Sequence, residues 1–155
     1  MKAIFSGSFD PITVGHLDII QRASKMFDTL YVGICMNSEK KSTFSLEQRK
    51  KMAEAACEDM SNVKVVTIDG LLAEFTEAND VSVIVRGLRD SSDLSYEMPM
   101  AVINRSLRNH PETIFIPTKP EHSHISSSYV KDMIKYGESV DGLLPECVIR
   151  FINSI

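Results

Sequence analysis

The fold of this chain is decided by the stretch Gly7-Ser8-Phe9-Asp10-Pro11-Ile12-Thr13-Val14-Gly15-His16-Leu17. It follows a short apolar run, residues 3–5, that is typical of a buried strand, and it precedes residues 17–23, which have helical spacing. We therefore expect a strand, a turn built on Asp10-Pro11, and a helix whose first residues are Gly15 and His16, capped by Thr13. The unpaired N–H groups of such a helix start favour a bound phosphate, to which a histidine can donate a further hydrogen bond.

Strand-like apolar runs alternate with amphipathic stretches along the rest of the chain. Further strands are predicted at residues 30–36, 63–68, 81–85 and 113–117, and helices at 45 to about 60, 71–78, 93–108, 126–135 and 145–152. The alternation predicts an α/β fold, a single Rossmann-like, doubly wound domain over residues 1–155 with a five-stranded parallel sheet. Ligands of such folds bind beyond the carboxyl ends of the strands.

Composition narrows the class of protein. The chain has 155 residues and a formal net charge of -4, which argues against a nucleic-acid or membrane-surface binder. Cys35, Cys57 and Cys147 are odd in number and far apart, so we expect reduced thiols in a cytoplasmic protein. We expect neither a signal peptide, because Asp10 cuts the N-terminal apolar run short, nor a membrane span, because no apolar stretch is long enough.

Polar clusters follow the predicted strands. They are Ser8 to His16, Arg86 to Arg89, His122 to Ser128, and the pair Lys40 and Lys41. Because parallel strands end at one rim, these clusters bring two helix starts, cations and hydroxyls together, which favours a polyphosphate site. The alternatives without a binding role are that the arginines and lysines are simply solvated and that the serines only cap a helix. His122 and His124 lack a third ligand nearby, so we expect no metal held by the protein.

Neither a P-loop, G-x-x-x-x-G-K-[ST], nor a G-x-G-x-x-G motif is present. Instead G-S-F-D-P-I-T-x-G-H at residues 7–16, R-G-L-R at 86–89 with Tyr96-Glu97 behind it, and I-S-S-S-x-V-K at 125–131 follow one another in order. Together they resemble the bacterial phosphopantetheine adenylyltransferases of the nucleotidylyltransferase superfamily. The T-x-G-H element alone would indicate only the superfamily.

The resemblance implies a reaction and a set of site residues. ATP and 4′-phosphopantetheine would give dephospho-coenzyme A and pyrophosphate, with Mg²⁺. The implied catalytic residues are His16, Lys40 and Arg86, and phosphopantetheine would contact Ser8, Lys40, Leu72 and Arg86. ATP would contact Ser8, Phe9, His16, Gly87, Leu88, Arg89, Glu97, His122, Ser123, His124, Ile125, Ser126, Ser127 and Ser128. The resemblance also implies a homohexamer and inhibition by coenzyme A.

The chain departs from the family pattern in places. Ser6 stands where proline is usual, Leu94-Ser95 replace Phe-Glu, and Pro99 interrupts a predicted helix and should bend it. His122 and His124 stand where aromatic residues are common. Two alternatives stay open: a related transferase that acts on another acceptor, such as nicotinamide mononucleotide, and a regulatory module that binds ATP without turnover.

Overall fold

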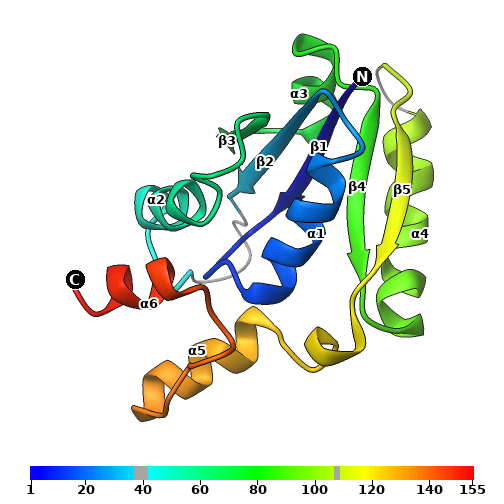
Figure 1. The fold of residues 1–155 in the computed structure, drawn as a ribbon. Helices are drawn as coiled ribbons and strands as arrows, with labels where there is room; N and C mark the ends of the chain where they lie inside the picture. The colour runs from blue at the N-terminus through cyan, green and yellow to red at the C-terminus, as the bar shows by residue number, and fades with distance from the viewer. Residues whose placement is uncertain (37–41, 107–108) are drawn as a thin grey trace.

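A five-stranded parallel sheet forms the centre of the molecule. The computed structural model describes residues 1–36, 42–106 and 109–155. The strands are β1 (Lys2–Gly7), β2 (Thr29–Cys35), β3 (Val63–Ile68), β4 (Val83–Leu88) and β5 (Glu112–Pro117). They pair in the order β3-β2-β1-β4-β5, all parallel, as Figure 1 shows. The predicted fold class is confirmed, and the strand order reverses between β1 and β4, where doubly wound folds bind ligands.

Helices cover both faces of the sheet. They are α1 (Val14–Ser24), α2 (Leu46–Ala56), α3 (Leu72–Ala78), α4 (Ser91–Ser106), α5 (Ser127–Tyr136) and α6 (Glu146–Ile152), with a 3₁₀ turn η1 (Pro120–His122). Residues of α1, α2 and α6 share one apolar cluster with the sheet, whereas α3 packs on a second cluster across it. In Figure 1, α5 and α6 lie beyond the end of the sheet toward which the strand arrows point. No helix of the described residues is both long enough and apolar enough to cross a membrane.

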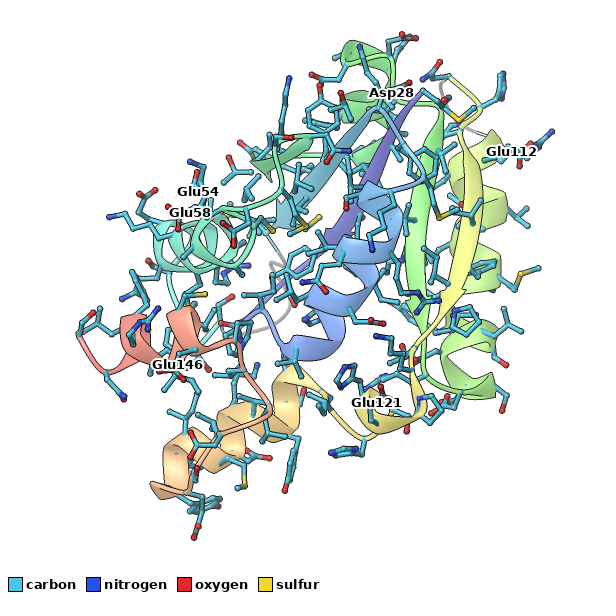
Figure 2. All side chains as sticks on the ribbon, viewed as in Figure 1. Asp28, Glu54, Glu58, Glu112, Glu121 and Glu146 are labelled. Atoms are coloured by element: carbon cyan, nitrogen blue, oxygen red, sulfur yellow. The ribbon has the colours of Figure 1, made fainter. Side chains whose placement is uncertain are left out.

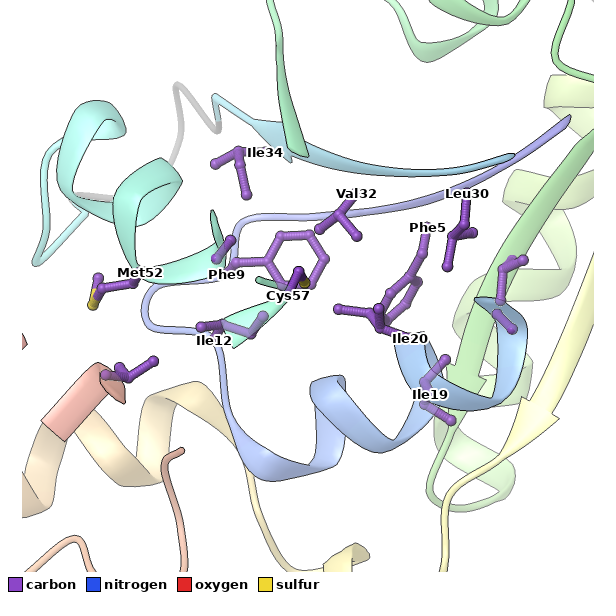
Figure 3. Close-up of a cluster of buried hydrophobic side chains, with 14 of the residues drawn as sticks. Phe5, Phe9, Ile12, Ile19, Ile20, Leu30, Val32, Ile34, Met52 and Cys57 are labelled. Atoms are coloured by element: carbon purple, nitrogen blue, oxygen red, sulfur yellow. The ribbon is translucent and has the colours of Figure 1, made fainter. Parts of the chain in front are cut away.

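The larger cluster holds the β1–α1 connection in place. Phe9 and Ile12 from this connection are buried beside Ile20 of α1 and Val32 of β2 (Figure 3). The Phe9 ring meets Phe5 edge-on, with 5.4 Å between the ring centroids. Burying one such side chain contributes about 1.5–3 kcal/mol, so the turn before α1 is anchored by packing as well as by hydrogen bonds.

Several boundaries differ from the predicted ones. Strand β4 runs to Leu88, not to residue 85, because the backbone of Arg86 to Leu88 continues the ladder with β5 although Arg86 and Gly87 interrupt the apolar run. Helix α2 ends at Ala56 rather than near residue 60, because the backbone leaves the helical conformation at Cys57, with φ -106° and ψ 6°.

Two helices start earlier than predicted. Helix α1 begins at Val14, and α4 begins at Ser91 because the Asp90 carboxylate accepts the N–H groups of Ser92 and Asp93. Helix α4 then continues through Pro99 to Ser106.

Candidate active site

A cavity of about 390 Å³ opens at the carboxyl ends of β1 and β4, between the starts of α1 and α5. It is lined by Phe5, Ser6, Gly7, Ser8, Phe9, Thr13, Gly15, His16, Ile19, Arg86, Gly87, Arg89, Asp93, Glu97, Thr118, His122, Ile125, Ser126, Ser127 and Ser128. Three of the four polar clusters singled out in the sequence therefore meet in one place.

The start of α1 presents His16 to this cavity in a fixed orientation. The Thr13 hydroxyl accepts the His16 N–H at 3.3 Å, and His16 Nδ1 accepts the Thr13 N–H at 3.1 Å, which together form a capping box. Because Nδ1 is the acceptor of a backbone N–H, the proton of the neutral ring resides on Nε2. His16 thus offers a hydrogen-bond donor at Nε2.

The surroundings of His16 keep its imidazole neutral. Burial, together with the positive charges of Arg89 and Arg86, lowers its pKa from 6.5 to about 4. Its ring also meets Phe9 edge-on at 5.1 Å between centroids. The neutral imidazole can still stabilise negative charge on a phosphate, because its one remaining N–H, at Nε2, is not used by the cap.

Arg86 is held in the cavity wall by partners on two other elements. Its Nε and Nη2 donate to the two Glu97 carboxylate oxygens at 2.7 and 2.6 Å, a bidentate pair. Its Nη1 donates to the Ser6 carbonyl at 2.5 Å and lies 3.3 Å from the Ser6 hydroxyl. Ser6, one of the residues that depart from the family pattern, thus supplies a hydroxyl to the site.

The start of α5 forms a second group of donors. Ser126 caps α5 by accepting the Tyr129 N–H at 3.1 Å, and the Ser127 hydroxyl donates to the Pro11 carbonyl at 2.9 Å. The second bond fixes the start of α5 to the β1–α1 connection. Ser126 is therefore the cap of α5, and Ser126, Ser127 and Ser128 also line the cavity.

Two buried charges hold the segments around the cavity together. Asp10 accepts the N–H groups of Thr43 and Phe44, both at 2.9 Å, and pairs with Lys131 of α5 at 3.3 Å. Arg49 of α2 donates to the Ser8 carbonyl at 2.7 Å and to the Cys35 carbonyl at 3.0 Å. Positions of Ser8 and of the α5 start therefore depend on residues outside the cavity wall.

Most predicted site residues that the structure describes line the cavity, and four do not. Leu72 packs instead on the apolar cluster beneath α3, and Leu88 ends β4 outside the lining. Ser123 and His124 are exposed, and the Ser123 hydroxyl donates to Pro120 within its own turn. Lys40 lies outside the described residues, so its role stays a prediction.

The cavity also contains polar residues that the sequence did not single out. They are Asp93, whose carboxylate accepts hydrogen bonds from Arg89, and Thr118, which directly follows β5. The spacing of Arg89 and Asp93 was no helical signal, because Arg89 lies before the start of α4 at Ser91. Thr118 carried no signal either.

Acidic side chains lie both in the cavity wall and elsewhere on the molecule. In Figure 2, Glu54, Glu58 and Glu146 lie around α2 and α6. In the cavity Glu97 is paired with Arg86, and Asp93 with Arg89. The residues described include no group of three metal-ligating side chains.

Comparison with known proteins gives the class. A family model described as cytidylyltransferase-like matches residues 4–133. A solved structure from Vibrio parahaemolyticus, assigned as a nicotinate-nucleotide adenylyltransferase, superposes with a TM-score of 0.74 and covers 99% of this chain and 91% of that one. At 18% identity it shows the fold alone. The chain belongs to the cytidylyltransferase-like family of nucleotidyltransferases.

Closer relatives narrow the family. A phosphopantetheine adenylyltransferase of Clostridium novyi (strain NT) is 46% identical over 154 residues, covering 99% of this chain and 96% of the relative. Another, from Clostridium tetani (strain Massachusetts / E88), is 45% identical over 150 residues, with 97% and 94% covered. Within the wider family, the chain is a member of the phosphopantetheine adenylyltransferases, as its motifs predict.

Proposed function

We propose that this chain transfers the AMP moiety of ATP to 4′-phosphopantetheine and releases dephospho-coenzyme A and pyrophosphate. The observation that carries this is the convergence, in one cavity, of the neutral His16 donor, Arg86, Arg89 and the starts of α1 and α5. All of these groups stabilise negative charge on a bound ligand, and none of them is needed as a nucleophile. Such a site suits phosphoryl chemistry in which positioning and charge stabilisation supply the catalysis.

The step is a direct displacement at the α-phosphorus of ATP. An oxygen of the phosphopantetheine phosphate forms the new bond, and the bond from the α-phosphorus to the bridging β-oxygen breaks, so that pyrophosphate leaves with its electron pair. A phosphate monoester is largely dianionic at neutral pH, with a second pKa of about 6, so no general base is needed. His16 Nε2–H would stabilise the charge that develops on the α-phosphate.

The remaining roles divide between the two substrates. On the acceptor side, Ser8 would orient the attacking phosphate, Arg86 and Lys40 would neutralise it, and Leu72 would contact the pantetheine arm. On the ATP side are Phe9, Gly87, Leu88, Arg89, Glu97 and the run His122, Ser123, His124, Ile125, Ser126, Ser127 and Ser128. For Leu72, Leu88, Ser123 and His124 this assignment rests on the family resemblance, because they lie outside the cavity lining.

Mg²⁺ is proposed to enter with ATP. Magnesium in phosphoryl-transfer sites is commonly held by substrate phosphates and one or two carboxylates, and it neutralises their charge when bound. Asp93 and Glu97 are the carboxylates of the cavity lining, and both are held by arginines. The donor set therefore fits an ion that the triphosphate carries in.

The proposed assembly is a homohexamer in the cytoplasm. An apolar surface on α4 supports self-association: Tyr96, Met100 and Ile103 recur at the spacing of one helix face and are 71%, 42% and 48% exposed. An exposed apolar face of this kind marks an interaction site in soluble proteins. Coenzyme A is the proposed inhibitor, because it contains the pantetheine and adenylate parts of both substrates.

The experiment that tests the activity is a pyrophosphate-release assay with ATP, Mg²⁺ and phosphopantetheine. Release that depends on phosphopantetheine supports the proposal. The same assay with nicotinamide mononucleotide tests the alternative acceptor. ATP binding without any release would instead indicate a regulatory module.

A further inference from the structure

We propose that Asp93 is a positioning residue for Arg89, whose guanidinium it holds on the cavity wall so that the remaining N–H groups meet the outer phosphates of a nucleoside triphosphate. The inference rests on the proposed function and adds a residue that the family motifs quoted above do not single out. Its basis is the geometry of the Asp93–Arg89 pair and its place in the cavity.

Three hydrogen bonds join the two residues. Asp93 Oδ1 accepts from Arg89 Nη2 at 2.9 Å, and Oδ2 accepts from Nε at 3.0 Å and from the Arg89 backbone N–H at 2.9 Å. The bidentate contact sets the plane of the guanidinium. It uses two of the five guanidinium N–H groups, and no side chain or carbonyl of the described residues accepts from the other three.

Both members of the pair line the cavity, and both are ionised. The Arg89 side chain is 39% exposed and the Asp93 side chain 20%. Hydrogen bonds from Arg89 lower the pKa of Asp93, so its carboxylate keeps its charge at neutral pH. One helical turn further along α4, Glu97 holds Arg86 in the same bidentate way. Helix α4 thus supplies one carboxylate to each arginine of the cavity.

A carboxylate in the wall of a phosphate-binding cavity is expected to weaken phosphate binding. Its charge repels the ligand, and a partly exposed ion pair within one turn of chain stabilises a fold only slightly. A fixed guanidinium, in contrast, loses less conformational entropy when phosphate binds than a free side chain does. The orientation of Arg89 therefore explains the presence of Asp93 in the cavity wall better than a contribution to the stability of the fold does.

The test is a double-mutant cycle on ATP affinity. ATP binding is measured by calorimetry, without acceptor, for wild type, Asp93→Ala, Arg89→Ala and the double variant. Asp93→Ala is expected to weaken ATP binding roughly tenfold, as expected for losing a charge-assisted contact. In the Arg89→Ala background the same change should have no effect or tighten binding, because only the repulsion is left to remove. In turnover, KM for ATP should rise while KM for phosphopantetheine stays unchanged.

Two further variants separate positioning from charge and from folding. Asp90→Asn removes a neighbouring carboxylate but keeps a side chain that can cap α4, and it should change ATP affinity by less than about twofold. Asp93→Asn keeps the shape of the side chain, so it replaces alanine in the cycle if Asp93→Ala does not fold.

The outcomes are distinct. Equal or tighter ATP binding by Asp93→Ala overturns the proposal, as does an equal loss in the Arg89→Ala background. Wild type that binds ATP but transfers nothing would refute the proposed function, while the cycle would still decide the role of Asp93. Wild type that binds no ATP overturns both.

Discussion

The capping role of His16 makes the stability of this protein depend on pH in a way that one substitution should remove. Glutamine is the usual partner of threonine in a capping box, and it does not titrate. We therefore expect His16→Gln to keep the bond to the Thr13 N–H near neutral pH, at the cost of the ring contact with Phe9.

The magnitude follows from the pKa of His16, which is about 4 in the folded protein and 6.5 in the unfolded chain. Because the folded-state pKa is the lower one, the unfolded chain binds more protons between these values, and stability falls as the pH drops below 6.5. At about 1.4 kcal/mol per pH unit, wild type should lose about 2 kcal/mol from this group between pH 7 and pH 5. His16→Gln should lose none of it.

The assay is urea unfolding of both proteins at pH 7 and pH 5 in phosphate-free buffer, since bound anions would favour the protonated ring. Carboxylates titrate alike in both proteins, so the difference between them isolates His16. Identical pH dependence in the two proteins, or a His16 NMR titration centred near 6.5, would refute the reasoning.

Further outcomes follow for activity. His16→Ala should keep the fold and lower turnover by on the order of 10²–10³-fold in a steady-state assay, and a loss below about threefold would exclude the donor role. Arg86→Ala should weaken phosphopantetheine binding and turnover more than it weakens ATP binding, which calorimetry with each substrate can measure. An equal loss of ATP affinity would contradict the assignment of Arg86 to the acceptor phosphate. Replacing Cys35, Cys57 and Cys147 by alanine should leave a folded, active protein, because none of them lines the cavity. Burial also raises the pKa of Cys57 to about 12, so its thiol is not a reactive thiolate. A folded but inactive variant would contradict direct transfer. EDTA should stop turnover and added Mg²⁺ restore it, with circular dichroism unchanged; turnover that persists in EDTA would remove Mg²⁺ from the scheme.

The sequence predicted those features that local patterns encode. The β1–α1 segment could be predicted because the spacing of apolar residues changes from that of a strand to that of a helix around Asp10-Pro11. Thr13, the predicted cap of α1, is confirmed. Strand positions followed from apolar runs, except where Arg86 and Gly87 continue β4 through backbone pairing that no side-chain pattern records.

Long-range pairings could not be predicted in this way. The bond from Ser127 to Pro11 joins residues 116 positions apart, and the pair of Asp10 with Lys131 spans 121. Such contacts depend on how whole elements pack, and a single sequence does not specify them. The pairing of Glu97 with Arg86 spans only 11 positions, but it too depends on how α4 packs beside β4.

Direct transfer from ATP to phosphopantetheine is tested most directly by following oxygen atoms. Phosphopantetheine labelled with ¹⁸O in its phosphate is incubated with ATP, Mg²⁺ and the protein, and the products are analysed by mass spectrometry. Dephospho-coenzyme A that carries all of the label, formed together with unlabelled pyrophosphate, is the predicted result. ADP as a product, label in the pyrophosphate, or an adenylylated protein would contradict it.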